Sequence, residues 1–292
     1  MNNKLRDTIK YLVYSFIMLV WAFFVAILYA EGRADFYIAP RMSILVKIGA
    51  TILFLLGSLQ AIRAAMLWSP AHKDSDSCCD CHPSTHKNYL SVTLTLACLF
   101  IVPVIAGYMM KENVLTSDIA VKKGISYSSA RLIDLDLTKY PLEGTQSRFP
   151  TNKYLKEYTG LAEFLDEEEV IIVDDALYTE TLTTLDIYKE QFVGKKINLR
   201  GFVYQDPALD SAKFALLRFS VLCCIADAFP HAVVVDSSDV YVPYNDTWVD
   251  LTGTLGIVEV GTEKVLQIHA EDMAVLEDNP DPYVYMNEDF GR

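Results

Sequence analysis

The first 110 residues are dominated by long apolar stretches. Residues 11–30 contain no charged side chain and follow Lys4, Arg6 and Lys10. At about 1.5 Å per helical residue, this length crosses the hydrocarbon layer of a bilayer, which is about 30 Å thick. The stretch is longer than the apolar part of a signal peptide, and no small-x-small cleavage pattern follows it. The pattern therefore predicts a transmembrane helix.

Two more stretches are long enough to cross a bilayer. Residues 89–110 are uncharged, and their proline and glycine are tolerated in membrane helices, where packing partners satisfy the freed backbone groups. Residues 43–68 carry Lys47 and Arg63 near their ends, and these long side chains can extend toward lipid headgroups. We therefore predict three helices across a lipid bilayer, at residues 11–30, 43–68 and 89–110.

The Lys and Arg residues that flank these predicted helices are almost evenly divided between the two sides of the membrane. The first helix usually sets the orientation, and a long acidic domain is translocated largely regardless of its charge. We therefore expect a multi-pass protein of the cell membrane, with a cytoplasmic N-terminus and an extracytoplasmic C-terminal domain.

From residue 170 on, the chain changes to short β-branched and aromatic runs separated by turn residues. One parity of residues 213–224 is apolar, namely Ala215, Leu217, Phe219, Val221 and Cys223. The other parity includes Arg218, Ser220 and Cys224. Similar runs at residues 194–204, 231–236, 246–260 and 264–276 bring the number of predicted strands to five.

Five short strands in about 90 residues, with glycines where a small barrel must bend, predict an all-β, OB-like barrel over residues 170–292. A β-sandwich is the alternative. Residues 111–169 show no sustained period and are predicted to be a linker and packing segment, in which residues 155–165 can form a short amphipathic helix. The predicted fold class is a three-helix membrane anchor joined to an all-β domain.

Composition agrees with this division. The 292 residues are 52% hydrophobic, and their mean hydropathy of +0.21 is high for one soluble domain. The net charge of −13 is uneven, because residues 1–110 hold 9 basic and 6 acidic side chains and the rest hold 16 and 32. A strongly acidic second half argues against a nucleic-acid partner. Six cysteines are too few for a disulfide scaffold.

Several motifs resemble one known family. The runs GKKINLRGFVY, LRFSVLCCIADAFPHAVVV and DTWVDLTGTL, together with the N-terminal helix set, resemble the DUF1980 family of YcgQ-like proteins. The R-x-x-x-x-C-C-x-A-D-A segment, residues 218–228, is its most specific part. The resemblance extends over essentially the whole chain. It implies a membrane location and a permease partner, a multi-spanning subunit of the YcgR type, and it supplies no substrate.

Two residues of these motifs stand out. Arg218 opens the most specific segment, and Trp248 lies in DTWVDLTGTL. We expect Trp248 to anchor the barrel or to cover its mouth.

The loop between the second and third predicted helices, residues 71–86, is rich in metal-binding residue types. They are His72, Cys78, Cys79, Cys81, His82 and His86. Thiolate and imidazole together suit Zn²⁺ or another soft transition metal such as Cu⁺. The C-C-x-C-H spacing lacks the paired C-x-x-C geometry of a zinc knuckle, so a solvated loop with clustered cysteines is an equal alternative. A redox or acylation role is a third.

A second candidate site contains Cys223, Cys224, Asp227 and His231. Adjacent strand residues point to opposite faces, so both thiols serve one site only if the strand ends there. A helical turn would bring Asp227 to the same face as Cys224, and His231 could approach after the following proline. Arg218 would lower the pKa of a neighbouring thiol, which favours metal ligation or thiol exchange. Buried, inert cysteines and a strained vicinal disulfide are the alternatives.

No phosphate-binding loop or zinc-protease motif is present. The two uncharged apolar stretches also contain no Asp, Glu or His, which a pore would need. We therefore expect a non-enzymatic, non-pore accessory subunit of a membrane permease, and we add transition-metal handling as a hypothesis. The alternatives are a binding module that acts alone outside the cell and a membrane thiol-redox protein that uses Cys223 and Cys224.

Overall fold

The computed structural model describes residues 3–68, 89–109, 115–129, 147–238, 240–277, 283–287 and 289–291. The chain forms two compact units, Met1–Asn113 and Val114–Arg292. We call them the helical unit and the barrel unit, and each is described by itself.

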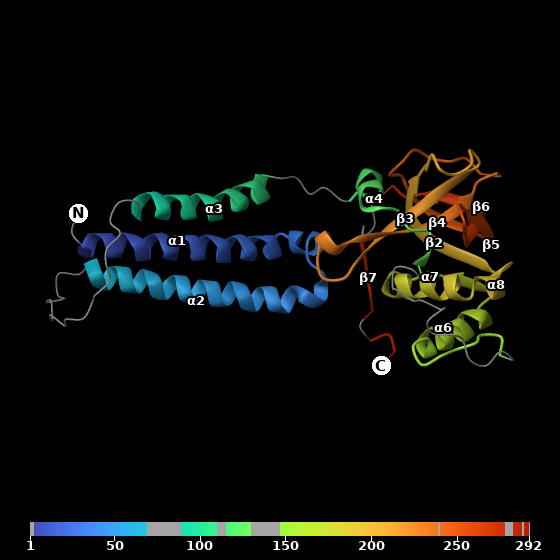
Figure 1. Ribbon diagram of the computed structural model, residues 1–292, viewed down its shortest axis with the longest axis horizontal. Coiled ribbons are helices and arrows are strands. Elements are labelled where there is room, and N and C mark those ends of the chain that lie inside the picture. Colours follow the sequence, from blue (N-terminus) through green and yellow to red (C-terminus); the bar gives the residue numbers. More distant parts are fainter. Residues whose placement is uncertain are drawn as a thin grey trace. The chain divides into compact units, whose positions relative to one another are not determined.

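The described residues of the helical unit form three helices, α1 (Asn3–Ala30), α2 (Ser43–Trp68) and α3 (Tyr89–Met109) (Figure 1). Two short 3-10 turns, η1 (Arg33–Phe36) and η2 (Pro40–Met42), lie between α1 and α2. The segments Asp7–Ala30 and Pro40–Trp68 are long and apolar enough to cross a membrane. In the described part of α3, the apolar stretch is shorter, Ala97–Met109. Two of the predicted apolar helices are therefore confirmed, and a third span stays a prediction.

Small residues allow α1 and α2 to pack closely. The Ser15 hydroxyl donates to the Gly57 carbonyl at 2.8 Å, and a Cβ on Gly57 would lie 3.0 Å from Leu19 Cγ. Close backbone approach and polar bridges of this kind stabilise helix pairs in lipid, where apolar burial alone does not.

A polar contact also joins α1 to α3. The Trp21 indole donates to the Phe100 carbonyl at 3.0 Å, in the turn before Pro103. A proline lacks the N–H that would continue the helical ladder, so neighbouring helices commonly satisfy backbone groups near it.

The described part of the barrel unit contains seven strands. They are β1 (Val170–Ile172), β2 (Lys196–Tyr204), β3 (Lys213–Val221), β4 (Phe229–Asp236), β5 (Trp248–Val260), β6 (Glu263–Val275) and β7 (Tyr283–Tyr285). The five predicted strands correspond to β2 through β6 and are confirmed to within a few residues. β1 and β7, of three residues each, were not predicted.

Five of these strands close into a ring. β2, β3 and β4 pair in succession as antiparallel neighbours, and β5 returns to pair with β2. β6 fills the remaining place, antiparallel to β5 and parallel to β4. The unit is therefore barrel-like, and the sandwich alternative is wrong. β1 and β7 extend the ring in parallel, on β2 and β3.

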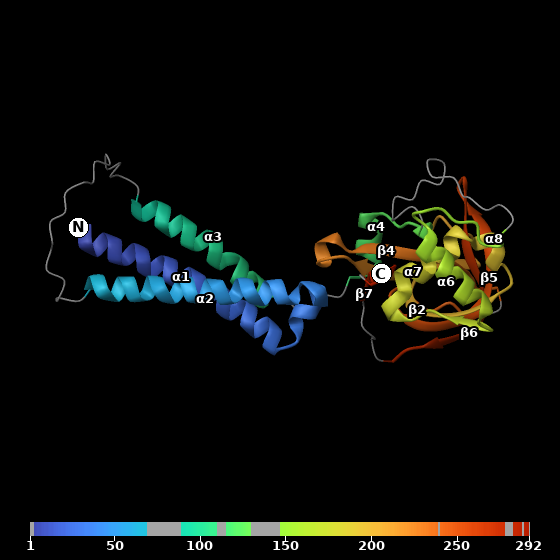
Figure 2. The same cartoon turned by 90° about the horizontal axis from the view of Figure 1, so that it is seen from below.

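The all-β prediction for residues 170–292 is incomplete. Within that range, the described residues also form η3 (Asp175–Leu177), α7 (Tyr178–Ile187), α8 (Lys189–Phe192) and η4 (Ile225–Asp227). Two further helices of the barrel unit, α4 (Ser117–Lys123) and α6 (Lys156–Glu167), precede it. In Figures 1 and 2, α6 and α7 lie side by side, and α7 contacts β6 and β7. The threonine-rich α7 has weak helix propensity, but Tyr178, Leu182 and Leu185 share a helical face and are buried in the core.

Residues before the first strand also belong to the barrel unit. The predicted helix near residues 155–165 is confirmed as α6. Its Ala162 and Leu165 are buried in the core, as is Phe149 upstream. This part of the predicted linker and packing segment therefore packs against the barrel.

The predicted faces of β3 differ from the observed ones. Phe214 and Leu216 contribute to the main core, on the parity that also carries Arg218. Leu217, on the parity expected to be the core, is buried too, and the Phe219 ring stacks on Phe202 with centroids 5.9 Å apart. Alternation cannot identify the interior face of a strand that is buried on both sides.

Candidate functional site

The turn between β3 and β4 brings two thiols and a carboxylate together. Cys223 Sγ lies 3.9 Å from Cys224 Sγ and 2.7 Å from Asp227 Oδ2. One ligand atom from each of these three residues lies within 4.8 Å of the other two. All three residues are partly exposed. In the described part of the chain, this is the one group of metal-binding side chains with such proximity.

Backbone hydrogen bonds hold the Asp227 carboxylate in this turn. Its Oδ1 accepts from Leu222 N at 2.8 Å, and its Oδ2 accepts from Cys223 N at 2.8 Å and Cys224 N at 3.1 Å. The Asp227 backbone N–H donates in return to the Cys224 side chain, which completes a capping box. The turn therefore positions all three side chains before any ligand arrives.

A lysine from α4 braces the same turn. Lys123 Nζ donates to the carbonyls of Ala226 at 3.0 Å and Ala228 at 2.6 Å. The conformation of the turn is therefore stabilised by the Asp227 side chain of the turn itself and by Lys123 of α4.

The carboxylate changes the acidity of the thiol. The hydrogen bond to Asp227, with a smaller effect of Cys224, raises the pKa of Cys223 to about 11. Partial burial opposes ionisation of Asp227, but the hydrogen bonds from Cys223, Leu222 and Cys224 outweigh it and lower the pKa of the carboxyl. Without a metal, Cys223 is therefore a thiol at neutral pH, which is a poor nucleophile.

Three expectations about this site are wrong. Arg218 does not lower the pKa of the thiol, because its guanidinium binds Asp175 instead. His231 is not in the group with Cys223, Cys224 and Asp227, because β4 already begins at Phe229 and carries His231 into the barrel. The condition for both thiols to serve one site, that the strand ends before them, is met, since β3 ends at Val221 and the η4 turn follows Cys224. The placing of Cys223 on an apolar strand face is wrong for the same reason.

Arg218 is the centre of a second, buried cluster. Its side chain is 1% exposed, and both terminal nitrogens donate to the Asp175 carboxylate, NH2 to Oδ2 at 3.1 Å. The guanidinium carbon also lies 5.3 Å from the Tyr178 ring centroid and 5.4 Å from that of Trp248. The two family-motif residues, Arg218 and Trp248, are thus in contact, and Trp248 is buried against Arg218 and Phe202.

His231 lies beside Arg218 in the strand register and is 1% exposed. Its Nδ1 is 3.3 Å from Ser129 Oγ, and its Nε2 has no hydrogen-bond partner among the described residues. Burial lowers the pKa of His231 to about 3. The imidazole is therefore neutral at physiological pH.

Sequence reasoning missed Asp175, Tyr178 and Ser129. A signal for the first two exists, because Asp174 caps the helical segment by accepting from Ala176 N at 2.7 Å, and an aspartate before apolar residues at helical spacing marks a helix start. Nothing in the local pattern links Ser129 to His231, which is about 100 residues away in the chain.

The predicted cysteine-rich cluster, His72, Cys78, Cys79, Cys81, His82 and His86, lies outside the described residues. The described part of the helical unit offers one cysteine, Cys98, which is free and exposed.

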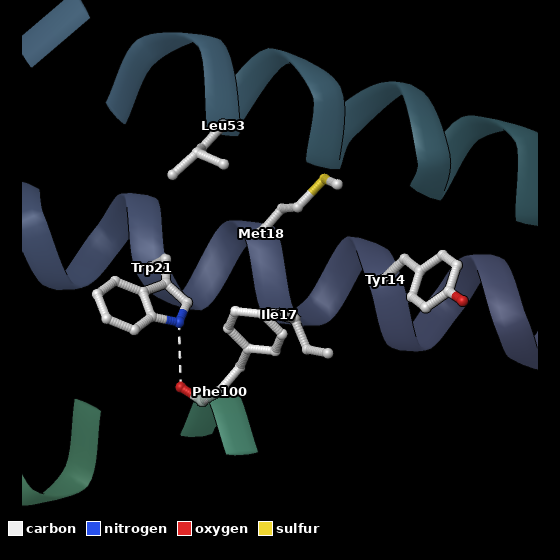
Figure 3. Close-up of a pocket in the computed structure, with 6 residues that line it drawn as sticks. All are labelled: Tyr14, Ile17, Met18, Trp21, Leu53 and Phe100. Carbon is white, nitrogen blue, oxygen red and sulfur yellow. Dashed lines mark hydrogen bonds between the residues drawn. The ribbon is translucent and has the colours of Figure 1, made fainter. Parts of the chain in front are cut away.

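The helical unit contains a groove of about 430 Å³ between its helices. It is lined by Tyr14, Ile17, Met18, Trp21, Leu53 and Phe100 (Figure 3). None of these side chains is a carboxylate, an imidazole or a thiol. The groove therefore provides a surface for apolar packing and no ligands for a cation.

Comparison with known proteins matches both units. The DUF1980 N-terminal domain matches residues 13–126, and the DUF1980 C-terminal domain matches residues 148–286. The UPF0703 protein YcgQ of Bacillus subtilis (strain 168) is 24% identical over 286 residues, which cover 92% of this chain and 97% of that protein. A protein of Streptococcus mutans, named as a candidate two-component membrane permease complex subunit, is 22% identical over 92% of its own length and 87% of this chain.

We predict that Asp175→Ala destabilises the barrel unit by about 1–3 kcal/mol, because a buried guanidinium loses two charge-assisted hydrogen bonds. The half-exposed position of Asp175 keeps the loss below that of a fully buried ion pair. Chemical unfolding of the full chain in detergent, followed by near-UV circular dichroism, measures the change. The exposed Glu163→Ala is the matched control, and equal stabilities of the two variants would contradict the role of Asp175.

We also predict that the barrel unit loses stability as the pH falls below about 6.5. In this range the unfolded chain binds a proton at His231 and the folded chain does not. Lowering the pH by one unit therefore lowers the free energy of unfolding by at most about 1.4 kcal/mol. Between about pH 7 and pH 5, His231 should lower the free energy of unfolding by about 2 kcal/mol. Unfolding curves of the protein and of His231→Gln at both pH values test this, since other titrating groups cancel in the difference. Parallel pH dependences would show that His231 does not contribute.

Proposed function

Because this chain belongs to the DUF1980 family, we propose that it is a membrane-anchored, non-enzymatic accessory subunit of a two-component membrane permease complex. The observation that carries the proposal is the relation to the Streptococcus mutans protein, whose name assigns it to such a complex. This relation covers 87% of the chain, so it includes both the apolar helices and the barrel.

The helical unit supports the anchoring role. Two of its helices are apolar over a membrane-spanning length, and we propose that α3 forms a third span, with the N-terminus in the cytoplasm and the barrel unit outside. The described groove between the helices has no cation ligands. The conducting path is therefore assigned to the partner, a multi-spanning subunit of the YcgR type.

The barrel unit supports a docking or binding role. Three successive antiparallel strands with a fourth that returns beside the first form a Greek key, and β6 closes it as a five-stranded ring. This topology supports the OB-like assignment. OB-like barrels present a strand face and loops to their ligands, and we propose that this unit contacts the permease partner in that way.

Transition-metal handling is a further component of the proposal. It is supported by the converging thiols and carboxylate of Cys223, Cys224 and Asp227. The thiol-redox alternative is disfavoured by the same geometry, because Asp227 raises the pKa of Cys223 to about 11 and a redox nucleophile needs a thiolate.

Co-expression with the YcgR-type partner tests the proposal. We expect the tagged full-length chain to bring the partner through affinity and size-exclusion steps in detergent, and each protein to raise the thermal stability of the other. An unrelated membrane protein with the same tag is the control. A chain that always elutes alone, and whose loss of function phenotype is unchanged in a strain without the partner, would instead support a binding module that acts by itself.

A further inference from the structure

The geometry of the β3–β4 turn can be compared with that of a tetrahedral metal site. Zn²⁺–thiolate distances of about 2.3 Å at a tetrahedral angle separate two sulfur ligands by about 3.8 Å. The observed distance between Cys223 Sγ and Cys224 Sγ is 3.9 Å. The two thiols are therefore already spaced for a shared ion, without movement of the backbone.

The carboxylate is close to a ligand position but not yet in it. The same geometry separates a thiolate sulfur from a carboxylate oxygen by about 3.6 Å, whereas Cys223 Sγ and Asp227 Oδ2 are 2.7 Å apart. The shorter distance reflects the thiol proton between them. When a metal replaces that proton, the two atoms must separate by about 1 Å, which side-chain rotation in a partly exposed turn allows.

We propose that Cys223, Cys224 and Asp227 form a three-ligand site for Zn²⁺ or a comparably thiophilic transition-metal ion, with the fourth coordination position open. Structural zinc sites use four protein ligands, whereas sites that exchange a ligand keep one position free. Leu222 on the same turn is 40% exposed, and the three ligands are themselves partly exposed, so an incoming ligand can reach the ion.

Binding balances without a redox step. Two thiol protons are released to solvent, two metal–sulfur bonds and one metal–oxygen bond form as the hydrated ion loses the water ligands that they replace, and Asp227 stays a carboxylate throughout. A remaining water occupies the fourth position. The Asp227 backbone N–H that donates to the Cys224 side chain then stabilises the thiolate charge. The transfer of the ion to a permease rests on the proposed function, whereas binding of the ion does not.

The test uses the full-length chain in detergent, in a background that carries Cys78→Ser, Cys79→Ser and Cys81→Ser. Co²⁺ is the spectroscopic probe and Zn²⁺ the competitor. We expect one Co²⁺ per chain with a thiolate-to-cobalt charge-transfer band, and we expect Zn²⁺ to displace the Co²⁺.

Variants of the turn in this background identify the ligands. Adding Cys223→Ser or Cys224→Ser should abolish the band. Adding Asp227→Ala should weaken Zn²⁺ binding by about 10- to 100-fold, a range measured when groups that support a metal site are removed. Cys98→Ser, an exposed thiol outside the turn, is the matched control and should change nothing.

Zinc X-ray absorption on the loaded background protein supports or overturns the proposal independently of any turn variant. Two sulfur neighbours at about 2.3 Å support it, and a shell of oxygen and nitrogen only overturns it. A background protein that binds no Co²⁺, or that keeps its band after both turn cysteines are replaced, also overturns it. Because no partner is present in these assays, failure to form the permease complex would leave their outcome unchanged.

Discussion

Closure of the five-stranded ring is the constraint on which the barrel unit depends. β2 pairs with β5 over Lys196 to Phe202 and with β3 only over Phe202 to Tyr204, so this short seam joins the two ends of the ring. The strands approach too closely for a side chain at two glycines, Gly201 beside this seam and Gly253 at the register shift between β5 and β6. A Cβ at Gly201 would lie 2.8 Å from the Leu217 carbonyl oxygen, and one at Gly253 only 2.3 Å from that of His269. The ring closes because these positions lack a Cβ.

Closure explains why one end of the barrel is rich in buried polar groups. The β3–β4 ladder places Arg218 beside His231, and the start of α7 covers both. Asp175 neutralises the guanidinium, and Thr179 bonds to Ser220 at 2.7 Å. Such a network specifies how α7 docks, because leaving any of its members unpaired in a dry interior is costly. The strands that hold this end then separate at Val221, and the turn beyond carries Cys223 and Cys224 to the surface.

The five strands and the apolar helices could be predicted because period-two alternation and long uncharged stretches are local signals. The proximity of Asp227 to Cys224 also followed from local spacing. Three features could not be predicted this way. The helix α7 is rich in threonine, which favours strands, and its burial in the core stabilises it. Arg218 meets a partner 43 residues earlier in the chain. The sequence suggests that Pro230 ends the turn and that His231 then approaches it. In the structure Pro230 is part of β4, and the next residue in this strand, His231, is buried in the barrel.

A closed barrel holds both the buried cluster around Arg218 and the exposed β3–β4 turn in place. Amide hydrogen exchange of the full-length protein in detergent, measured by mass spectrometry on residues 202–204, tests this closure most directly, because these residues form the β2–β3 seam. We expect exchange at these residues to be as slow as in the long β5–β6 hairpin, since a closed ring opens as one unit. Exchange at the seam as fast as in the exposed loops, with β5 and β6 still protected, would contradict it.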